Sequence, residues 1–391
     1  MSSLALKKIS ALVSGFMVRV RGYRKVLLPL RKKEDILRLP VMARADLKAF
    51  AAAGFIPSAF NITSTSGSTG SRLLIVHSRA AYNMHLRRLA RMYRSIGAGP
   101  GEVCLNLCSY ELNSGGRMME AAYKAAGSGV IALGGISTPQ KCDEAVSLIR
   151  ALRPAIVNAY TNQLFDLFSR LGARHSIRKC VVNGEPLWPS YRERIERIGK
   201  VRIHDHYGAM EVSGFAITRR PEDPYMSVFS DGLFFEVLRD DGTAADEGVG
   251  ALLVTDLENT CMPFIRYRLG DRVELCRRRG AIMVKVLSRT EDTVLVNGVV
   301  GVKSMMIRTV NDLLGHPDFF FEIKKDSTTY KDTLLVNIPA ADMPVGPKLT
   351  GLLRLVAGID PCVVAKAFHG AVPRMANGKI RYFIDGRERA V

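Results

Sequence analysis

The sequence of 391 residues predicts an α/β protein: a large N-terminal domain of parallel α/β layers plus a β-rich section, followed by a small mobile α+β C-terminal domain. Three observations support this. Strand-like and helical patterns alternate from residue 77 to about residue 208, short strands follow from about residue 225, and a smaller mixed pattern begins near residue 292. With 47% hydrophobic residues the chain can bury a large core, and we expect domains at 1–290 and 291–391.

The first section consists of repeated strand and helix units. It opens with a helical spacing of apolar residues from Tyr82 to Ile96. Units of this size imply a largely parallel sheet that is covered by helices. In chain order, the expected elements are the strand EVCLNLCSY, the helix GRMMEAAYKAAG, the strand GVIALGG, a helix over 139–152, the strand AIVNAY, a helix over 161–171, the strand KCVVNGE, a helix over 189–198 and the strand VRIHDHYG.

The chain changes character after residue 225. Strands linked by Gly, Asp and Arg turns indicate an antiparallel or barrel-like section, and we expect the domain boundary near residues 288–292. The expected strands are DGLFFEVL, GALLVTDL, DRVELC and AIMVKVLS; in the small domain they are FFFEIKK, TLLVNIP and CVVAKAF, with helices over 302–314 and 346–357.

Positive charge is concentrated near the N-terminus. The net charge is +19, and residues 1–50 hold twelve Lys or Arg against three Asp or Glu. Such a basic face can attract nucleic acid, anionic lipid or an acidic protein, and a solvated surface is an equally good explanation. No recognised nucleic-acid module accompanies it, so we expect no nucleic-acid partner. No eighteen-residue apolar run or signal-peptide pattern occurs, so we expect a cytoplasmic protein without an integral membrane segment.

The stretch NITSTSGSTGSRLLIVHS, at 61–78, places hydroxyls around Gly67 and Gly70. The glycine spacing and the missing lysine exclude a Walker loop, and GSTG is not a nucleophile elbow, so hydrolase chemistry has no support. Exposed amides and hydroxyl donors can still form a concave anion site that follows triphosphate oxygens. His204 and His206 lie on one predicted strand face, but no third ligand is apparent and we predict no metal there. The seven scattered cysteines are expected to be reduced and mostly buried.

The hydroxyl loop and further stretches in the same order resemble the adenylate-forming superfamily of acyl-CoA synthetases, adenylation domains and luciferases. The segments LRLPVMARADLKAF and LNSGGRMMEAAYKAAGSGVIALGG are similar to its compact phenylacetate-CoA ligase-like branch. The matching motifs are TSTSGSTGSR (phosphate), VVNGEPL and DHYGAMEVSG (adenine), PFIRYRLGD (ribose), SRTEDTVLVNGV (hinge) and PRMANGKIR (catalytic lysine).

This resemblance implies an ATP-dependent, AMP-forming carboxylic-acid ligase. It would make an acyl-adenylate, release pyrophosphate and pass the acyl group to a thiol, with coenzyme A as the expected acceptor. The family match implies Mg²⁺ at Glu211 and catalytic roles for Lys379, Glu211 and Thr69, and the small domain is expected to rotate at 289–292 between the two steps. The implied nucleotide-binding residues are Ser66, Gly67, Ser68, Thr69, Gly70, Gly184, Glu185, Pro186, Tyr207, Gly208, Asp271, Arg289 and Lys379.

The acyl group and its acceptor are less narrowly defined. The pocket positions favour an aromatic or short apolar acid, while the loop lacks the family's proline and lysine and Glu291 stands at the hinge. Two alternatives stay open: transfer to an acyl carrier protein or an amine, and a non-catalytic nucleic-acid- or lipid-binding protein on a decayed ligase fold. A homodimer is also compatible with the sequence. The implied pocket residues are Tyr110, Ser114, Gly115, Gly116, Tyr160, Asn183, Ala209, Met210 and Gly214.

Overall fold

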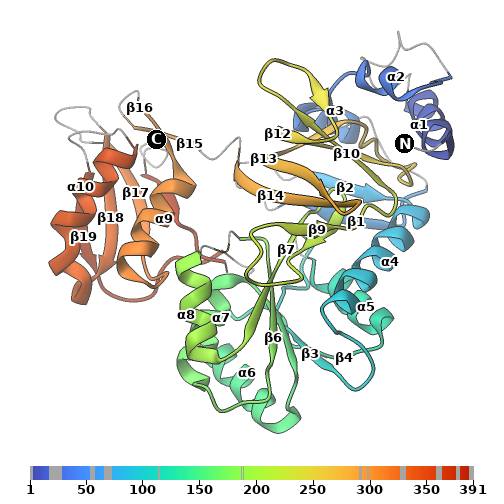
Figure 1. The fold of residues 1–391 in the computed structure, drawn as a ribbon. Coiled ribbons are helices and arrows are strands. Elements are labelled where there is room, and N and C mark those ends of the chain that lie inside the picture. Colours follow the sequence, from blue (N-terminus) through green and yellow to red (C-terminus); the bar gives the residue numbers. More distant parts are fainter. Residues whose placement is uncertain are drawn as a thin grey trace.

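The computed structural model describes residues 3–16, 29–52, 58–65, 73–112, 115–185, 187, 189–289, 293–296, 299–325, 332–357, 363–375 and 379–386. A large N-terminal part and a smaller C-terminal part stand side by side (Figure 1). In the described ranges no helix is both long enough and apolar enough to cross a membrane. Five of the described cysteines are buried and unpaired, and Cys276 is unpaired and half-buried.

One twelve-stranded sheet runs through the large part. Its first five strands, in the order β4-β3-β5-β6-β7, are parallel, and the others, β8-β9-β14-β13-β12-β10-β11, are antiparallel to their neighbours. The predicted parallel sheet and antiparallel section are therefore both present, but they form one continuous sheet because β7 turns directly into β8. The strands are β3 (Val103–Asn106), β4 (Gly129–Ala132), β5 (Ile156–Ala159), β6 (Lys179–Asn183), β7 (Arg202–Ala209), β8 (Ser213–Ile217), β9 (Met226–Val228), β10 (Leu233–Leu238), β11 (Ala244–Ala245), β12 (Gly248–Asp256), β13 (Tyr267–Arg278) and β14 (Ala281–Arg289).

Helices cover both faces of the parallel strands, because successive side chains of a buried strand point to opposite faces. Cys104 and Ile156 belong to the hydrophobic cluster of α4 and α5, whereas Leu105 and Val157 belong to that of α6, α7 and α8. Ser78 caps α4, since its hydroxyl accepts a hydrogen bond from the Ala81 amide. The helices are α4 (Arg79–Ser95), α5 (Gly116–Ala126), α6 (Pro139–Leu152), α7 (Thr161–Leu171) and α8 (Pro189–Gly199).

The antiparallel strands are covered by the N-terminal helices. Apolar side chains of α1, among them Ile9 and Val13, are fully buried in one cluster with Phe235, Val254 and Leu275. A two-stranded sheet lies beside this layer. These elements are α1 (Ser3–Phe16), α2 (Lys33–Leu37), α3 (Arg44–Ala52), β1 (Asn61–Ser64) and β2 (Leu74–His77).

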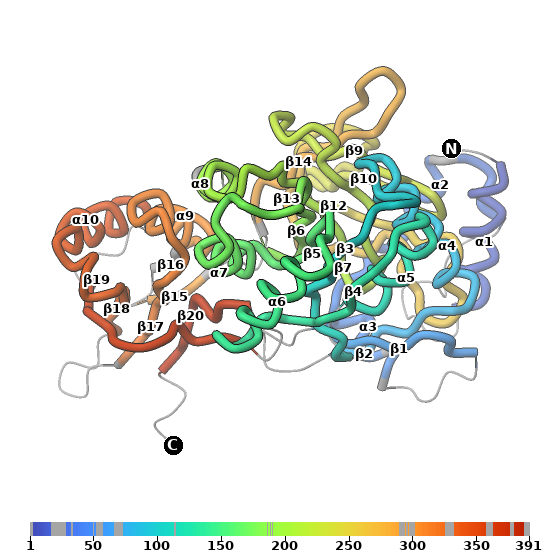
Figure 2. Tube along the Cα trace, turned by 90° about the horizontal axis from the view of Figure 1, so that it is seen from below, coloured from blue at the N-terminus to red at the C-terminus, as the bar shows by residue number. Residues whose placement is uncertain are grey.

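The C-terminal part has its own sheet and core. Its sheet has the order β19-β18-β17-β20, and α9 and α10 share its hydrophobic cluster. α9 lies beside α8 of the large part in both views (Figure 2). The predicted boundary at 290/291 falls at residues outside the described ranges. The elements are β15 (Thr293–Val296), β16 (Val299–Val302), α9 (Lys303–Leu314), β17 (Phe320–Lys325), β18 (Asp332–Pro339), a 3₁₀ helix (Ala340–Val345), α10 (Gly346–Ala357), β19 (Val363–Phe368) and β20 (Phe383–Asp385).

Candidate active site

Three buried asparagines mark the carboxyl ends of the parallel strands. The amide nitrogen of Asn158 donates to Asn106 Oδ1 (2.9 Å), and that of Asn183 donates to Asn158 Oδ1 (3.3 Å). Cys108 Sγ accepts from Asn158 and Asn183, at 3.4 and 3.3 Å. Asn106 also donates to the Tyr110 hydroxyl, at 2.9 Å. Buried polar groups must be paired, so this network fixes the floor of the predicted acid pocket.

The structure brings most of the predicted pocket residues to this edge of the sheet. Gly116 contributes its carbonyl, which accepts from Asn106 Nδ2 at 3.0 Å, and a Cβ on Gly116 would lie 2.3 Å from the Ser109 carbonyl. The sequence interpretation missed Asn106 and treated Cys108 only as a buried thiol. The signal that could have identified Asn106 is a lone amide inside the apolar run VCLNL, directly at the end of a strand.

The predicted adenine and ribose residues lie against each other. The Tyr207 hydroxyl donates to Asp271 Oδ2 at 2.8 Å, which joins β7 to β13, and the Tyr207 ring packs edge-on against Phe215 with centroids 4.9 Å apart. Arg289 lies directly opposite Asp271 in the strand register. Arg268, three residues before Asp271 on the same strand, lines a surface cleft with Asp240 and Arg272.

Glu211 follows β7 in the turn before β8 and is only 7% exposed. Its Oε1 accepts a hydrogen bond from the Tyr267 hydroxyl at 3.1 Å, and its backbone carbonyl accepts from His77 Nε2 at 2.9 Å. A single carboxylate oriented in this way fits a hard cation that takes its other ligands from substrate phosphates and water. Among the described residues no group of three His, Cys, Asp or Glu could hold a metal ion by itself.

The turn at Glu211 rests on a buried polar cluster of His77, His85, Arg88 and Asp256. Arg88 donates to the carbonyls of Gly214 (3.0 Å), Asp231 (2.7 Å) and Val212, and burial lowers its pKa to about 10. His85 Nε2 donates to Asp256 Oδ2 at 3.0 Å. Burial lowers the pKa of His85 to about 4, so a neutral imidazole faces an ionised Asp256. Sequence reasoning assigned none of these four residues.

The two histidines of the HDHYG stretch, His204 and His206, are both buried and in contact with neighbouring groups. His206 is buried, its ring fills the space above Gly214, where a Cβ would lie 1.8 Å from Nε2, and burial lowers its pKa to about 4. His204 Nδ1 pairs with the Thr218 carbonyl at 2.7 Å. Both side chains are thus accounted for by packing and backbone contacts.

Lys379 reaches the same edge of the sheet from the C-terminal part. Its Nζ donates to the Gly184 carbonyl at 2.7 Å and lies 4.6 Å from the centroid of the Tyr160 ring. Burial raises the pKa of neighbouring Glu185, and the charge of Lys379 opposes this rise. Gly184 has φ +72°, a left-handed backbone conformation that favours glycine, and a Cβ there would lie 2.5 Å from Lys379 Nζ and displace the end of that side chain.

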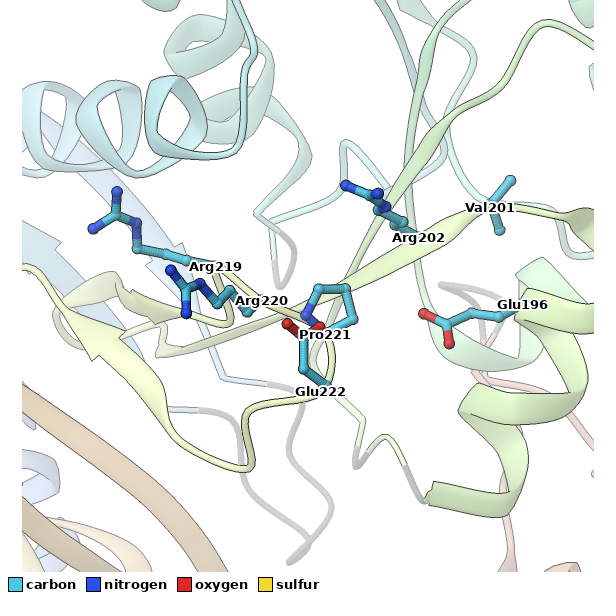
Figure 3. Close-up of a pocket in the computed structure, with 7 residues that line it drawn as sticks. All are labelled: Glu196, Val201, Arg202, Arg219, Arg220, Pro221 and Glu222. Carbon is cyan, nitrogen blue, oxygen red and sulfur yellow. The ribbon is translucent and has the colours of Figure 1, made fainter.

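Several predicted residues lie outside the described ranges: the loop residues Ser66, Gly67, Ser68, Thr69 and Gly70, together with Ser114, Pro186 and Glu291. A surface cleft of about 310 Å³ is lined by Glu196, Arg202, Arg219, Arg220 and Glu222, among others (Figure 3). Arg202 begins β7, whereas Tyr207 lies near its other end, so this cleft is at the edge of the sheet opposite the candidate site.

The chain is similar to known proteins in sequence and in fold. The model of the AMP-binding enzyme family matches residues 57–244. Phenylacetate-coenzyme A ligase of Thermus thermophilus is 26% identical over 324 residues, which cover 76% of this chain and 72% of that protein. A structure of 2-hydroxyisobutyryl-CoA ligase in the postadenylation state, in complex with R3-HIB-AMP, has a TM-score of 0.79 at 19% identity and covers 98% of this chain and 89% of that one.

The same ligase in the thioesterification state, in complex with 2-HIB-AMP and CoA, has a TM-score of 0.67 at 20% identity, covering 97% of this chain and 88% of that one. The fold is shared with both structures, and the arrangement of the two parts is closer to the first. Residues 57–244, just under half of the chain, thus match the AMP-binding enzyme family, and the chain is similar in sequence to a phenylacetate-coenzyme A ligase and in fold to 2-hydroxyisobutyryl-CoA ligase.

Proposed function

We propose that this chain is an ATP-dependent, AMP-forming carboxylic-acid ligase that makes an acyl-adenylate and transfers the acyl group to coenzyme A. The observation that carries the proposal is the convergence of three groups at the carboxyl edge of the parallel strands. These groups are the paired Tyr207 and Asp271, the oriented carboxylate of Glu211, and Lys379 above Gly184. The family match and the ligase homologue support the same chemistry.

In the first step a carboxylate oxygen attacks the α-phosphorus of ATP, and the bond to pyrophosphate breaks. Lys379 is a mobile cation within reach of the acid pocket, since it contacts the Gly184 carbonyl and the Tyr160 ring. There it would offset the repulsion between two anions and stabilise the charge that develops on the phosphate. Asp271 would accept hydrogen bonds from the ribose hydroxyls, and Tyr207 would stack on the adenine.

Glu211 would hold Mg²⁺, which when bound neutralises charge on the phosphate oxygens. In the second step the thiol of coenzyme A attacks the acyl carbonyl, the acyl–phosphate bond breaks and AMP leaves. We propose that the small domain rotates at residues 289–292 between the steps, a hinge movement that withdraws Lys379. The two TM-scores against one ligase in two states support such a movement.

For the substrate we propose an aromatic or short apolar acid. The asparagine floor is fully paired, and the rings of Tyr110 and Tyr160 stand at the pocket. Because the asparagine side chains at the base of the pocket already have hydrogen-bond partners, the shape of the pocket and contacts with the tyrosine rings would select the acyl group. We also propose a cytoplasmic location. Transfer to an acyl carrier protein is the second candidate acceptor reaction, which the basic N-terminal segment would favour. The expected homodimer stays a prediction.

The decisive experiment separates the two steps in Lys379→Ala. The rate of acyl-adenylate formation, measured as pyrophosphate release with a panel of acids, should fall about 100-fold or more. The reason is that an electrostatic donor of this kind contributes roughly 3 to 4 kcal/mol. Thioester formation from prepared acyl-AMP and coenzyme A should stay near the parent rate. Lys366→Ala, an exposed lysine on β19, is the matched control. Equal loss in both steps, or no loss in either, would remove Lys379 from the proposed mechanism.

A further inference from the structure

An ion pair connects the two parts of the molecule beside Lys379. Arg374 Nη2 lies 2.7 Å from Asp166 Oδ2, and the two side chains are only 18% and 27% exposed. Asp166 belongs to α7 of the large part, and Arg374 precedes β20 of the small part, 208 residues further along the chain. A contact between such distant segments depends on how the two parts are placed.

Arg374 and Lys379 belong to one hairpin. The Met375 amide donates to the Lys379 carbonyl and the Arg381 amide donates to the Pro373 carbonyl, each at 2.8 Å, and Arg374 forms a β-bridge with Ile380. The hairpin is fixed to the small domain directly after Arg381, because the Phe321 amide donates to the Tyr382 carbonyl at 2.7 Å. The position of Arg374 therefore sets the position of Lys379.

The charges on the two sides are complementary. The large part contributes the carboxylates of Asp166 and Glu185, and the small part contributes Arg374 and Lys379. Burial raises the pKa of both carboxyl groups, and Arg374 opposes the rise for each of them; Asp318, on the small part, adds to the rise at Asp166. Partly desolvated carboxylates are unfavourable without cations, so the charges favour this placement of the small part over one in which the hairpin has moved away.

We infer that Asp166 and Arg374 form a state-selective latch, in which Arg374 is a positioning residue that holds Lys379 over Gly184 and Tyr160. Rotation of the small domain breaks the latch, so the ion pair biases the protein toward the arrangement that forms the acyl-adenylate. The catalytic half of this inference rests on the proposed function, whereas the conformational half does not.

The conformational half is tested by a distance measurement between spin labels at Leu152→Cys and Leu355→Cys, in a background with Cys276→Ser and Cys362→Ser. Leu152 and Leu355 are 53% and 81% exposed and lie on α6 and α10. The parent should give one dominant distance. Arg374→Ala should raise the population of a second distance about tenfold, and the swap Asp166→Arg with Arg374→Asp should restore the parent distribution. Arg308→Ala, an exposed arginine paired within α9, should leave it unchanged. An unchanged distribution in Arg374→Ala would overturn the latch.

The catalytic half is tested by the two separate steps. Arg374→Ala should slow acyl-adenylate formation about tenfold while thioester formation from prepared acyl-AMP stays within about twofold, and Arg374→Lys should recover part of the first rate. Equal losses in both steps would show a merely structural role and refute the positioning role. Since the distance measurement needs no substrate, a parent protein that adenylates no acid would refute the proposed function and still leave the latch decided.

Discussion

Replacing Arg88 by Met removes the main support of the turn that carries Glu211. The Arg88 side chain is fully buried, and its guanidinium donates to the carbonyls of Val212, Gly214 and Asp231. Methionine fills a similar volume without any donor. The substitution therefore leaves three backbone carbonyls without this partner, two of them in the segment that follows Glu211.

The size of the effect follows from two opposing contributions. A buried acceptor without its donor costs about 1 to 3 kcal/mol, so three carbonyls cost about 3 to 9 kcal/mol. Removing the guanidinium also removes the net cost of burying its charge beside Asp256 and Asp231, which the lowered pKa of about 10 places at about 3 kcal/mol. The expected net loss is about 3 kcal/mol, or roughly 5 to 10 °C in Tm.

Thermal unfolding followed by circular dichroism measures this loss. The matched control is Arg87→Met, one residue earlier on α4, where the side chain is exposed and contacts only the Asn83 carbonyl of its own helix among the described contacts. Arg88→Lys keeps the charge and should lie between the parent and Arg88→Met. At 25 °C the folded Arg88→Met variant should also show a raised KM for Mg-ATP, because the turn at Glu211 is less well held. The same Tm in Arg88→Met and Arg87→Met would refute the reasoning.

Two further predictions concern the nucleotide site and the buried histidine. Asp271→Ala should raise the KM for ATP, because each ribose hydrogen bond to a charged acceptor contributes about 1.5 to 3 kcal/mol. The control is Asp240→Ala, which changes an exposed acidic residue next to β10. An unchanged ATP dependence in Asp271→Ala would show that the ribose site lies elsewhere. Burial depresses the pKa of His206 from 6.5 to about 4, so the unfolded chain binds the proton more readily and stability falls as the pH drops from 6.5 to about 4, by about 3 kcal/mol at most. His206→Phe should flatten this part of the stability profile measured by denaturant unfolding, and an equally steep profile would assign the acid sensitivity to other groups.

Much of the fold could be predicted from periodicity. The helices over 139–152 and 161–171 agree with α6 and α7, because caps and apolar spacing are local properties. The continuity of the twelve-stranded sheet could not be predicted, since it depends on pairing between β8, β9 and β14. Local patterns carry no information about which distant strand edges meet.

The difference between local patterns and long-range contacts also explains which parts of the candidate site could be predicted. Motifs indicated Tyr207, Asp271 and Lys379, but the contact of Lys379 with Gly184 joins residues 195 positions apart. From the sequence alone, Arg88 would be expected at the surface, because the chain is rich in basic residues. The available signal was its spacing: Ala81, His85, Arg88 and Met92 lie on one helix face, all buried, so two polar residues stand in the middle of an apolar stripe.

The continuous sheet also has a consequence for how such an enzyme can acquire new substrates. Asn106 and Asn183, which we propose to lie next to the acyl group, end parallel strands, whereas Asp271, the proposed ribose ligand, lies on an antiparallel strand of the same sheet. The continuous hydrogen-bonded sheet fixes the spacing between these two sets of side chains. Mutations can therefore reshape the acid pocket while the distance from the acyl group to the nucleotide stays constant, so substrate choice can diverge in evolution or in the laboratory without rebuilding the ATP site.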